Sequence, residues 1–252
     1  MYARTVDWTN AYYGPLYLDS VADLLTPELS ALEAAVIARL LALGPEDRVL
    51  DLACGHGRHA RALSGAVGAL VGVDRSGPYL ARAAAAAGAS PRPSRYVQGD
   101  LRALPFPGGA FDAAYSWYSS LFMWDDAGNA AALAGLARVL RPGGRALVHH
   151  ANPLRLAADP VAHARRELPD GAVVEEEARF DAATGVEIAR RRLARPDGTA
   201  LEGTASLRYY RPDEWGPLAR GAGLRVLALT STTGIAASAA EAPDLIAVIE
   251  RA

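Results

Sequence analysis

Short apolar runs that end in an acidic or polar residue alternate with amphipathic stretches over the first 150 residues of the chain. Such runs predict strands of a parallel sheet that is buried on both faces. The predicted strands begin at residue 49 and then cover residues 70–74, 95–101, 110–116 and 146–149. Helical patterns precede and separate them, at residues 24–43, 79–87 and 128–140. This alternation predicts an α/β fold with a doubly wound parallel sheet.

A different pattern follows residue 152 and interrupts the alternation. Residues 172–180, 186–195 and 200–210 predict three strands, because turn sequences typical of hairpins separate them. We expect residues 172–210 to form an antiparallel β insertion over the carboxyl ends of the core strands, where ligands bind in open α/β sheets. It serves either as a lid or as a dimer surface. Its charge runs at residues 175–177 and 190–192 predict a solvated cross-strand ladder.

The most informative segment is the glycine-rich loop that follows the first predicted strand. Gly55 and Gly57 tolerate positive φ angles and let the backbone approach a ligand, and the next helix offers its N-terminal amides to a nucleotide. The spacing Gly55-x-Gly57-x-x-Ala60 satisfies the dinucleotide fingerprint. Asp51, however, would repel a pyrophosphate, whereas it can bind the ammonium group of S-adenosylmethionine. The loop therefore favours S-adenosylmethionine over a dinucleotide.

Further polar residues follow the later strands. Asp74 ends the second strand, where it can accept hydrogen bonds from a ribose diol. Asp100 is suited to accept from an adenine amino group, and Leu101 to lie against the ring. The expected cofactor-binding residues near these strand ends are Asp51, Ala53, Gly55, Gly57, Asp74, Arg75, Asp100, Leu101 and Ser116.

In the order of these segments, and in the Arg141-Pro142-Gly143-Gly144 turn, the chain resembles the class I S-adenosylmethionine-dependent methyltransferases over residues 45–155. The resemblance implies a Rossmann-like, seven-stranded, mostly parallel sheet with S-adenosylmethionine as cofactor and S-adenosylhomocysteine as product. It extends more loosely to a last helix at residues 213–223 and closing strands at 224–230 and 245–249. The implied chemistry is direct in-line displacement of the methyl group.

The predicted organisation is one methyltransferase domain over residues 1–252. Residues 1–44 form a helical and aromatic cover, and residues 45–152 form the cofactor-binding core. The β insertion at 172–210 follows, and residues 211–252 supply the last helix and the closing strands.

Two aromatic segments lie where the resemblance places parts of the site. Near the N-terminus, Tyr12 and Tyr13 belong to an aromatic run that folds over the cofactor in similar methyltransferases; the alternative is a hydrophobic closure of the rim. A second run follows the fourth strand and lacks the Asn/Asp-Pro-Pro-Tyr/Phe motif of DNA and protein-glutamine amino-methyltransferases, which disfavours adenine, cytosine and glutamine amides. The residues expected in this substrate wall are Trp117, Tyr118 and Phe122.

Two histidines end the fifth strand at the same edge of the sheet. Because adjacent strand residues face opposite ways, only one of His149 and His150 can point into the site. Either one is a candidate general base, or is satisfied by a backbone carbonyl, and Tyr13 is a further catalytic candidate. Asn152 and Arg208 are expected to bind the acceptor, with a structural ion pair as the alternative for Arg208.

Composition and charge indicate which kinds of partner, such as nucleic acid, membrane or metal, the protein is not expected to bind. A net charge of −2 gives no basic footprint for nucleic acid. Cys54 is the only cysteine, which fits a reducing cytoplasm, and no apolar run approaches the roughly 18 residues that span a bilayer. No histidine has the spacing of a metal site. We therefore expect a cytoplasmic protein that binds neither nucleic acid nor membrane nor metal.

These observations predict a methyltransferase that acts on an N or O nucleophile of a small molecule. Two other classes stay open: an S-adenosylmethionine-binding sensor or scaffold without turnover, and a nicotinamide-dependent oxidoreductase, against which Asp51 argues. A homodimer through the β insertion is a further expectation. The sequence names neither the acceptor nor the methylated atom.

Overall fold

A seven-stranded sheet forms the core of the computed structural model, which describes residues 11–87 and 94–252. Its strands are β1 (Arg48–Leu52), β2 (Ala69–Asp74), β3 (Arg95–Gln98), β4 (Phe111–Ser116), β5 (Leu140–Ala151), β10 (Leu224–Thr230) and β11 (Asp244–Arg251). The spatial order is β10-β11-β5-β4-β1-β2-β3. All neighbouring pairs are parallel except those of β11, which runs antiparallel to β5 and β10. The prediction of a mostly parallel, Rossmann-like α/β sheet is confirmed.

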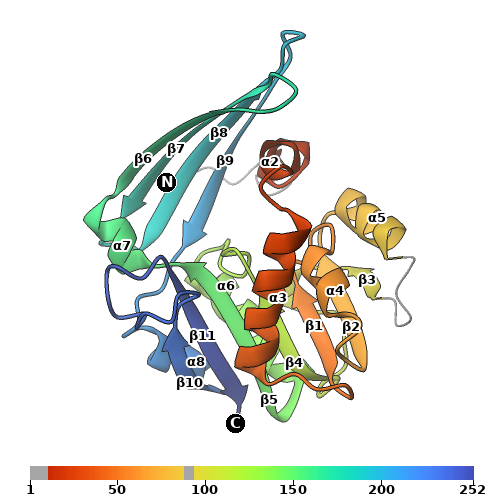
Figure 1. Ribbon diagram of the computed structural model, residues 1–252. Coiled ribbons are helices and arrows are strands. Elements are labelled where there is room, and N and C mark those ends of the chain that lie inside the picture. Colours follow the sequence, from red (N-terminus) through yellow and green to blue (C-terminus); the bar gives the residue numbers. More distant parts are fainter. Residues whose placement is uncertain (1–10, 88–93) are drawn as a thin grey trace.

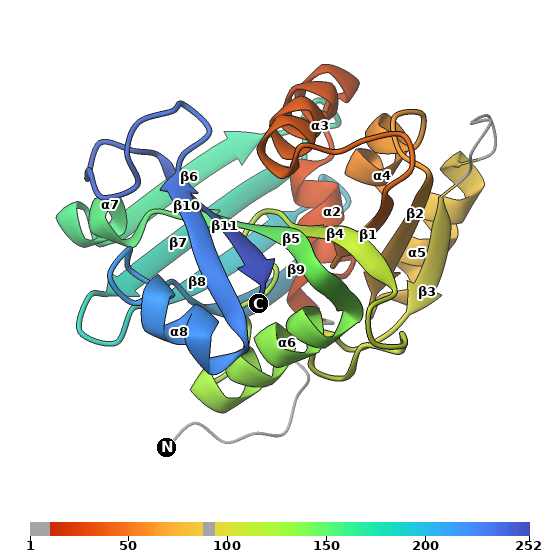
Figure 2. The ribbon, with the colours of Figure 1, turned by 90° about the horizontal axis from the view of Figure 1, so that it is seen from below.

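Helices cover both faces of this sheet, as Figures 1 and 2 show. One face packs against α3 (Pro27–Leu41) and α4 (Arg58–Leu63), and the other against α6 (Asp126–Val139) and α8 (Trp215–Gly221). Adjacent strand residues serve opposite faces, so Val49 and Leu147 pack on the first side and Leu50 and Val148 on the second. Burial on both sides explains why these strands are apolar runs without alternation. The remaining core elements are α5 (Gly77–Ala86), beside β2 and β3, and the short helix η1 (Leu101–Ala103).

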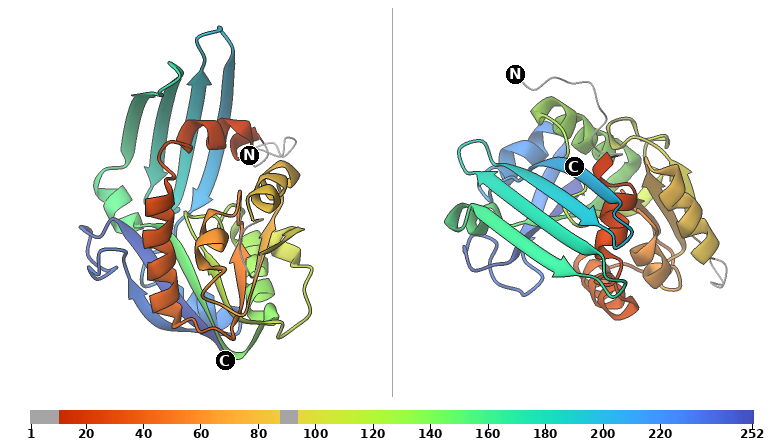
Figure 3. Two further views of the ribbon diagram at one scale, coloured as in Figure 1. Left: turned by 45° about the vertical axis from the view of Figure 1, so that its right-hand side comes forward. Right: turned by 90° about the horizontal axis from the view of Figure 1, so that it is seen from above.

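A second, four-stranded antiparallel sheet rises beyond the carboxyl ends of the core strands (Figures 1 and 3). Its strands, in spatial order, are β6 (Val161–Glu167), β7 (Val173–Asp181), β8 (Val186–Ala194) and β9 (Ala200–Arg208). Helix α2 (Pro15–Val21) lies against its inner face, where Tyr12 and Leu16 pack on Val174, Ala189 and Leu193. We call this sheet the small sheet.

The small sheet contains one strand more than the sequence indicated. Strand β6 was not predicted, because six of its seven residues are exposed and no apolar alternation marks it. Helix α7 (Pro153–Ala158), which precedes β6, was also missed, although its signals are present. Asn152 caps its first turn and Pro153 occupies the first helical position.

The predicted charge ladder forms, but only part of it is solvated. Residues 175–177 of β7 pair in register with residues 190–192 of β8. The middle pair, Glu176 and Arg191, faces inward, and Arg191 is only 9% exposed. Successive strand residues alternate between faces, so a run of three charges places its central member on the inner side. A wholly solvated ladder is therefore wrong for this pair.

Candidate functional site

The loop between β1 and α4 adopts the backbone that its glycines allow. Gly55 and Gly57 have φ angles of 54° and 72°, and Ala53 has a φ of 56°, a value uncommon for a residue with a side chain. A Cβ on Gly57 would lie 2.5 Å from the Tyr96 hydroxyl, whereas one on Gly55 would have its nearest neighbour, the Tyr79 ring, at 3.8 Å. Packing therefore requires a glycine at 57, and the space beside Gly55 is available to a ligand.

The carboxylate of Asp74, at the end of β2, holds this loop in place through hydrogen bonds. One oxygen accepts a hydrogen bond from the N–H of Gly55 at 2.8 Å, and the other accepts from the N–H of Ser76 at 2.8 Å. Each carboxylate oxygen keeps a further acceptor position. Asp74 and Arg75 line a cleft beside the loop, and the role of Asp74 toward a ribose stays a prediction.

Three buried polar atoms gather near the loop without a hydrogen-bond partner in the described part of the chain. They are Oδ2 of Asp51, Nη2 of Arg58 and the indole Nε1 of Trp117. All three residues line the same hollow beside Gly55. Burial raises the pKa of Asp51 to about 8. The Tyr115 hydroxyl lies beside the Asp51 carboxyl and opposes this increase. A buried carboxylate and two N–H donors that line one hollow suit a ligand that carries both an ammonium and a carboxylate group.

A cleft adjoins this hollow and shares its wall at the glycine-rich loop. The α2 segment covers it, because Tyr13, Gly14 and Tyr17 belong to its lining and the hydroxyl of Tyr79 on α5 donates to the carbonyl of Gly14 at 2.8 Å. The described residues that line the cleft are Tyr13, Gly14, Tyr17, Ala53, Gly55, Asp74, Arg75, Ser76, Tyr79, Leu101, Tyr118, Ser120, Met123 and Trp124. Five of these side chains are aromatic, so one wall of the cleft is aromatic and the other carries Asp74 and Arg75.

A buried acidic residue of α3 organises the wall of the hollow. Glu33 accepts hydrogen bonds from Arg58, from Nε2 of His59 at 2.9 Å and from the Tyr118 hydroxyl at 2.7 Å. Although burial opposes the effect, these hydrogen bonds lower the pKa of Glu33 to about 2. The sequence analysis missed Glu33. Its signal was a carboxylate within the apolar stripe of α3, beside Ala34 and Ile37.

The segment after β4 reaches the cleft through an uncommon backbone conformation. Tyr118 and Ser119 have φ angles of 55° and 59°. Such values in residues with side chains often mark functional sites. They turn the Tyr118 ring, which is 40% exposed, into the lining of both the hollow and the cleft, next to Trp117 in the hollow. The structure therefore brings Trp117 to the hollow and Tyr118 to both the hollow and the cleft, and their role as a substrate wall stays a prediction.

The two histidines that end β5 lie outside the cleft. His149 stacks on Trp117 with ring centroids 4.3 Å apart, accepts the Tyr118 N–H at Nδ1 and lies 3.4 Å from Asp244 through Nε2. His150 is fully buried on the opposite face against Trp215, and burial lowers its pKa to about 4. Neither ring faces the cleft, which argues against the predicted general base. Both nitrogens of His149 are already occupied by the protein.

Three further predicted residues are buried away from the cleft. The Asn152 amide donates to two backbone carbonyls of the segment before β11 and caps α7, so it is not available to an acceptor. Phe122 packs in the core against Trp215. Ser116 is fully buried at the end of β4.

Two predicted charged residues are bound to neighbouring side chains. Asp100 caps η1 and forms an ion pair with Arg102 at 2.6 Å, which leaves Leu101 as the cleft residue of this segment. Arg208 pairs with Glu214 at 2.5 Å, in agreement with the structural alternative given above. The predicted roles of Asp100 toward adenine and of Arg208 toward the acceptor gain no support.

Of the two N-terminal tyrosines, Tyr13 lines the cleft and Tyr12 does not. Tyr12 is buried against the small sheet, with the Arg191 guanidinium 5.3 Å from its ring centroid, and it does not line the cleft. Tyr13 does line it. The structure thus places Tyr13 in the site and Tyr12 in the packing of α2, rather than beside a cofactor. Trp8, in the same aromatic run, lies outside the described residues.

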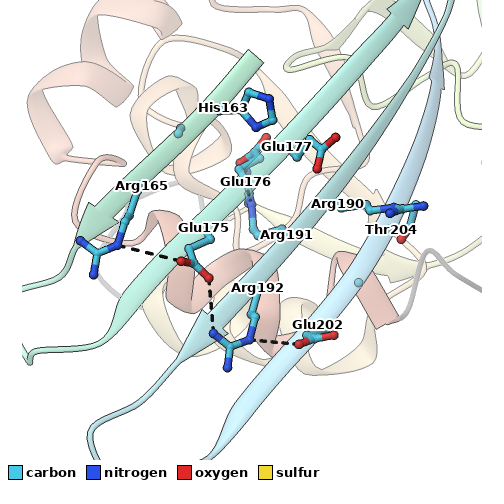
Figure 4. Close-up of a pocket in the computed structure, with 12 residues that line it drawn as sticks. His163, Arg165, Glu175, Glu176, Glu177, Arg190, Arg191, Arg192, Glu202 and Thr204 are labelled. Atoms are coloured by element: carbon cyan, nitrogen blue, oxygen red, sulfur yellow. Dashed lines mark hydrogen bonds and ion pairs between the residues drawn. The ribbon is translucent and has the colours of Figure 1, made fainter. Parts of the chain in front are cut away.

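The outer face of the small sheet carries a separate hollow of about 530 Å³, shown in Figure 4. Arg165, Glu175, Arg192 and Glu202 form a chain of ion pairs across it. Glu176 and Arg191 form a further pair among its lining residues, and it shares no residue with the cleft. We therefore place the candidate site at the strand ends.

Within residues 11–87 and 94–252, no group of three or more side chains is arranged to hold a metal ion, and no helix has the length and apolar character of a membrane span.

Comparisons with known proteins identify a family for the part of the chain that contains the loop. Residues 49–144, which contain the glycine-rich loop, match the family model described as "Methyltransferase domain". The chain is 37% identical over 139 residues to the 2-phytyl-1,4-naphtoquinone methyltransferase of Synechococcus elongatus, covering 53% of this chain and 58% of that protein. The chain thus spans less than two thirds of that curated relative.

Solved structures resemble the chain over most of its length. The CcbJ methyltransferase of Streptomyces caelestis superposes with a TM-score of 0.78 at 24% identity, covering 95% of this chain and 98% of that one. An S-adenosylmethionine-dependent methyltransferase of Clostridium acetobutylicum gives a TM-score of 0.77 at 14% identity, covering 93% and 96%. At these identities the likeness shows a shared fold.

Proposed function

We propose that this chain, which belongs to the class I S-adenosylmethionine-dependent methyltransferases, transfers a methyl group from S-adenosylmethionine to an N or O nucleophile of a small molecule. The observation that most supports cofactor binding is a group of buried polar atoms without hydrogen-bond partners. They belong to Asp51, Arg58 and Trp117 and lie beside the open space at Gly55. Buried polar groups are nearly always hydrogen-bonded, so such a group indicates a missing ligand.

The residues present fit this cofactor. Asp51 would bind the α-ammonium, and the free N–H groups of Arg58 and Trp117 would bind the α-carboxylate. Asp74 would accept from the ribose hydroxyls, and Leu101 would contact the adenine ring. When bound, S-adenosylmethionine supplies an electrophilic methyl group on a sulfonium ion. A dinucleotide fits less well, because Asp51 would repel its pyrophosphate.

The chain itself contributes position and exclusion of water. The aromatic wall formed by Tyr13, Tyr17 and Tyr118 would enclose the acceptor. Holding two reactants in near-attack geometry can supply on the order of 7–11 kcal/mol. Since His149 and His150 lie outside the cleft, the nucleophile is not expected to need a histidine base.

Methyl transfer can be tested directly with S-adenosylmethionine labelled in the methyl group. Purified protein is incubated with separate pools of small amines, phenols and reduced naphthoquinones, and the label and S-adenosylhomocysteine are measured by mass spectrometry. The proposal expects acceptor-dependent S-adenosylhomocysteine and label on nitrogen or oxygen. Cofactor binding with no transfer to any pool would favour a sensor or scaffold.

A second candidate reaction is methylation of a quinone ring carbon. The 37% identity to the 2-phytyl-1,4-naphtoquinone methyltransferase favours it, although the shared part is 53% of this chain. Label on a ring carbon of the reduced naphthoquinone, with none on the amines or phenols, would replace N or O transfer by this alternative.

A further inference from the structure

A carboxylate without an ionic partner lies on the inner face of the small sheet. Glu187 of β8 stands in register between Phe180 of β7 and Leu207 of β9, both of which are buried. Its Oε2 accepts a hydrogen bond from the Tyr209 hydroxyl at 3.0 Å. Within the described residues Glu187 forms no ion pair, whereas Glu176 on the same face is paired with Arg191.

Two side chains connect Glu187 and Tyr209 with the cleft. Tyr13 lines the cleft and packs against the inner face of the small sheet. Burial raises the pKa of Tyr13, and the phenols of Tyr17 and Tyr12 and, least of all, the Glu187 carboxylate add to the increase. Met123 also lines the cleft and packs against the cluster that contains Tyr209. Tyr13 and Met123 thus link the cleft with the part of the small sheet that carries Glu187, although Glu187 itself is not among the residues that line the cleft.

This carboxylate is costly to the protein on its own. It is mostly buried in an apolar row, and burial raises the pKa of Glu187. An ionised group in such surroundings lowers stability unless a cation accompanies it. The chain has 26 arginines, yet no arginine in the described segments is paired with Glu187. A cation supplied by a ligand would complete the site.

We propose that Glu187, oriented by Tyr209, binds the ammonium group of the methyl acceptor and takes up its proton, so that the acceptor is a small amine that attacks the methyl group with the lone pair set free. The inference rests on the proposed function and gives its acceptor a chemical class. The aromatic wall of the cleft would hold the body of the acceptor, and the carboxylate would select its charge. An amine is thereby distinguished from an alcohol or a quinone of similar shape, neither of which offers a cation.

The test uses pairs of probes that differ only in the ammonium group: tyramine against tyrosol, and glucosamine against glucose. Each is titrated by calorimetry into the full chain saturated with S-adenosylhomocysteine. The wild type is expected to bind at least one amine 10-fold or more tightly than its hydroxyl counterpart. Glu187→Gln should weaken that amine by roughly 10- to 100-fold and leave the hydroxyl compound unchanged.

A matched control lies on the same sheet. Glu177→Gln removes a carboxylate from the outer face, where Figure 4 shows it, and should leave amine binding unchanged. Tyr209→Phe keeps the carboxylate but removes its hydrogen bond, and should weaken amine binding about 3- to 10-fold. This second variant keeps the test decisive if Glu187→Gln folds poorly.

The outcomes separate the two proposals. If the wild type binds no S-adenosylhomocysteine, the proposed function fails. If it binds S-adenosylhomocysteine but no amine, or binds amines and hydroxyl compounds equally, the amine site is refuted while the methyltransferase assignment stands. Unchanged amine affinity in both Glu187→Gln and Tyr209→Phe would refute it as well.

Discussion

The buried carboxylate of Asp51 lowers the stability of the empty protein but is expected to strengthen cofactor binding. It is 3% exposed, with one oxygen unpartnered, near the end of a strand that is buried from Val49 to Leu52. A carboxylate in this place destabilises the empty protein and becomes favourable when a cation arrives. Residues that reduce stability in this way are expected at functional sites.

We expect Asp51→Asn to stabilise the empty protein and to weaken cofactor binding. Aspartate titrates near 3.9 in unfolded chains, whereas burial raises the pKa of Asp51 to about 8 in the folded protein. Between those values the folded state keeps a proton that the unfolded state has released, so stability falls as pH rises from about 4 to about 8.

Urea unfolding at pH 8 should therefore show Asp51→Asn to be more stable by about 1–3 kcal/mol. Calorimetry should show S-adenosylmethionine bound at least about 10-fold more weakly, because the ion pair is lost. Lower stability together with unchanged affinity would contradict this account of Asp51.

The two glycines of the loop should respond differently to alanine. Gly57→Ala combines a positive φ with a Cβ placed 2.5 Å from the Tyr96 hydroxyl, so unfolding should become easier by about 2–4 kcal/mol. Gly55→Ala meets only the backbone cost, about 1 kcal/mol, but fills space intended for the ligand. Urea midpoints and S-adenosylmethionine titrations measure both effects; equal loss of stability in the two variants would show that the loop is packed differently.

Local sequence was sufficient for the residues of this loop and insufficient for the histidines. Gly55, Gly57 and Asp51 are placed by the chain immediately around them, at the end of one buried strand. The positions of His149 and His150 depend on rings and carboxylates from distant segments, which strand alternation does not reveal. Sequence reasoning could state that they face opposite ways, but not that both faces are packed.

Helix α2 and the small sheet contact each other beside the cleft, and we call the two of them the cover. The Arg191 guanidinium lies 5.3 Å and 5.0 Å from the ring centroids of Tyr12 and Tyr17, and Arg195 forms an ion pair with Asp19 at 2.8 Å. Tyr17 also lines the cleft. The contacts that fix α2 to the small sheet therefore also set one wall of the site.

Two neighbouring glutamates of β7 should differ in their importance for this cover. Glu176→Gln deprives the buried Arg191 of its charged partner, and we expect the free energy of unfolding to fall by about 1–3 kcal/mol. Glu177→Gln removes an exposed pair and should leave the free energy of unfolding almost unchanged. Urea unfolding of both variants tests this. Comparable losses would mean that the small sheet is not tied to α2 through Arg191.

Elements were predictable where burial imposed a pattern. The core strands are apolar because both of their faces are covered, and the hairpins of the small sheet are marked by turn residues. Strand β6 pairs with β7 at an exposed edge of the small sheet. Its sequence therefore has neither an apolar run nor an alternation of apolar and polar residues. The role of the small sheet as a lid or as a dimer surface stays a prediction.

At the scale of the whole molecule, the cofactor region and the cover are separate parts that meet at one cleft. The family match is confined to residues 49–144, so it includes the glycine-rich loop and excludes α2 and the small sheet. In our proposals the core therefore binds the cofactor. The cover, where Tyr13 and Glu187 lie, selects the acceptor.

The central claim is that the strand ends of this molecule bind S-adenosylmethionine. The most direct measurement is calorimetric titration of the purified chain with S-adenosylmethionine, S-adenosylhomocysteine and NAD under the same conditions. We predict binding of the first two in the micromolar range and none of NAD, because Asp51 favours a cation and opposes a pyrophosphate. Binding of NAD alone would contradict the assignment and make the chain a candidate oxidoreductase.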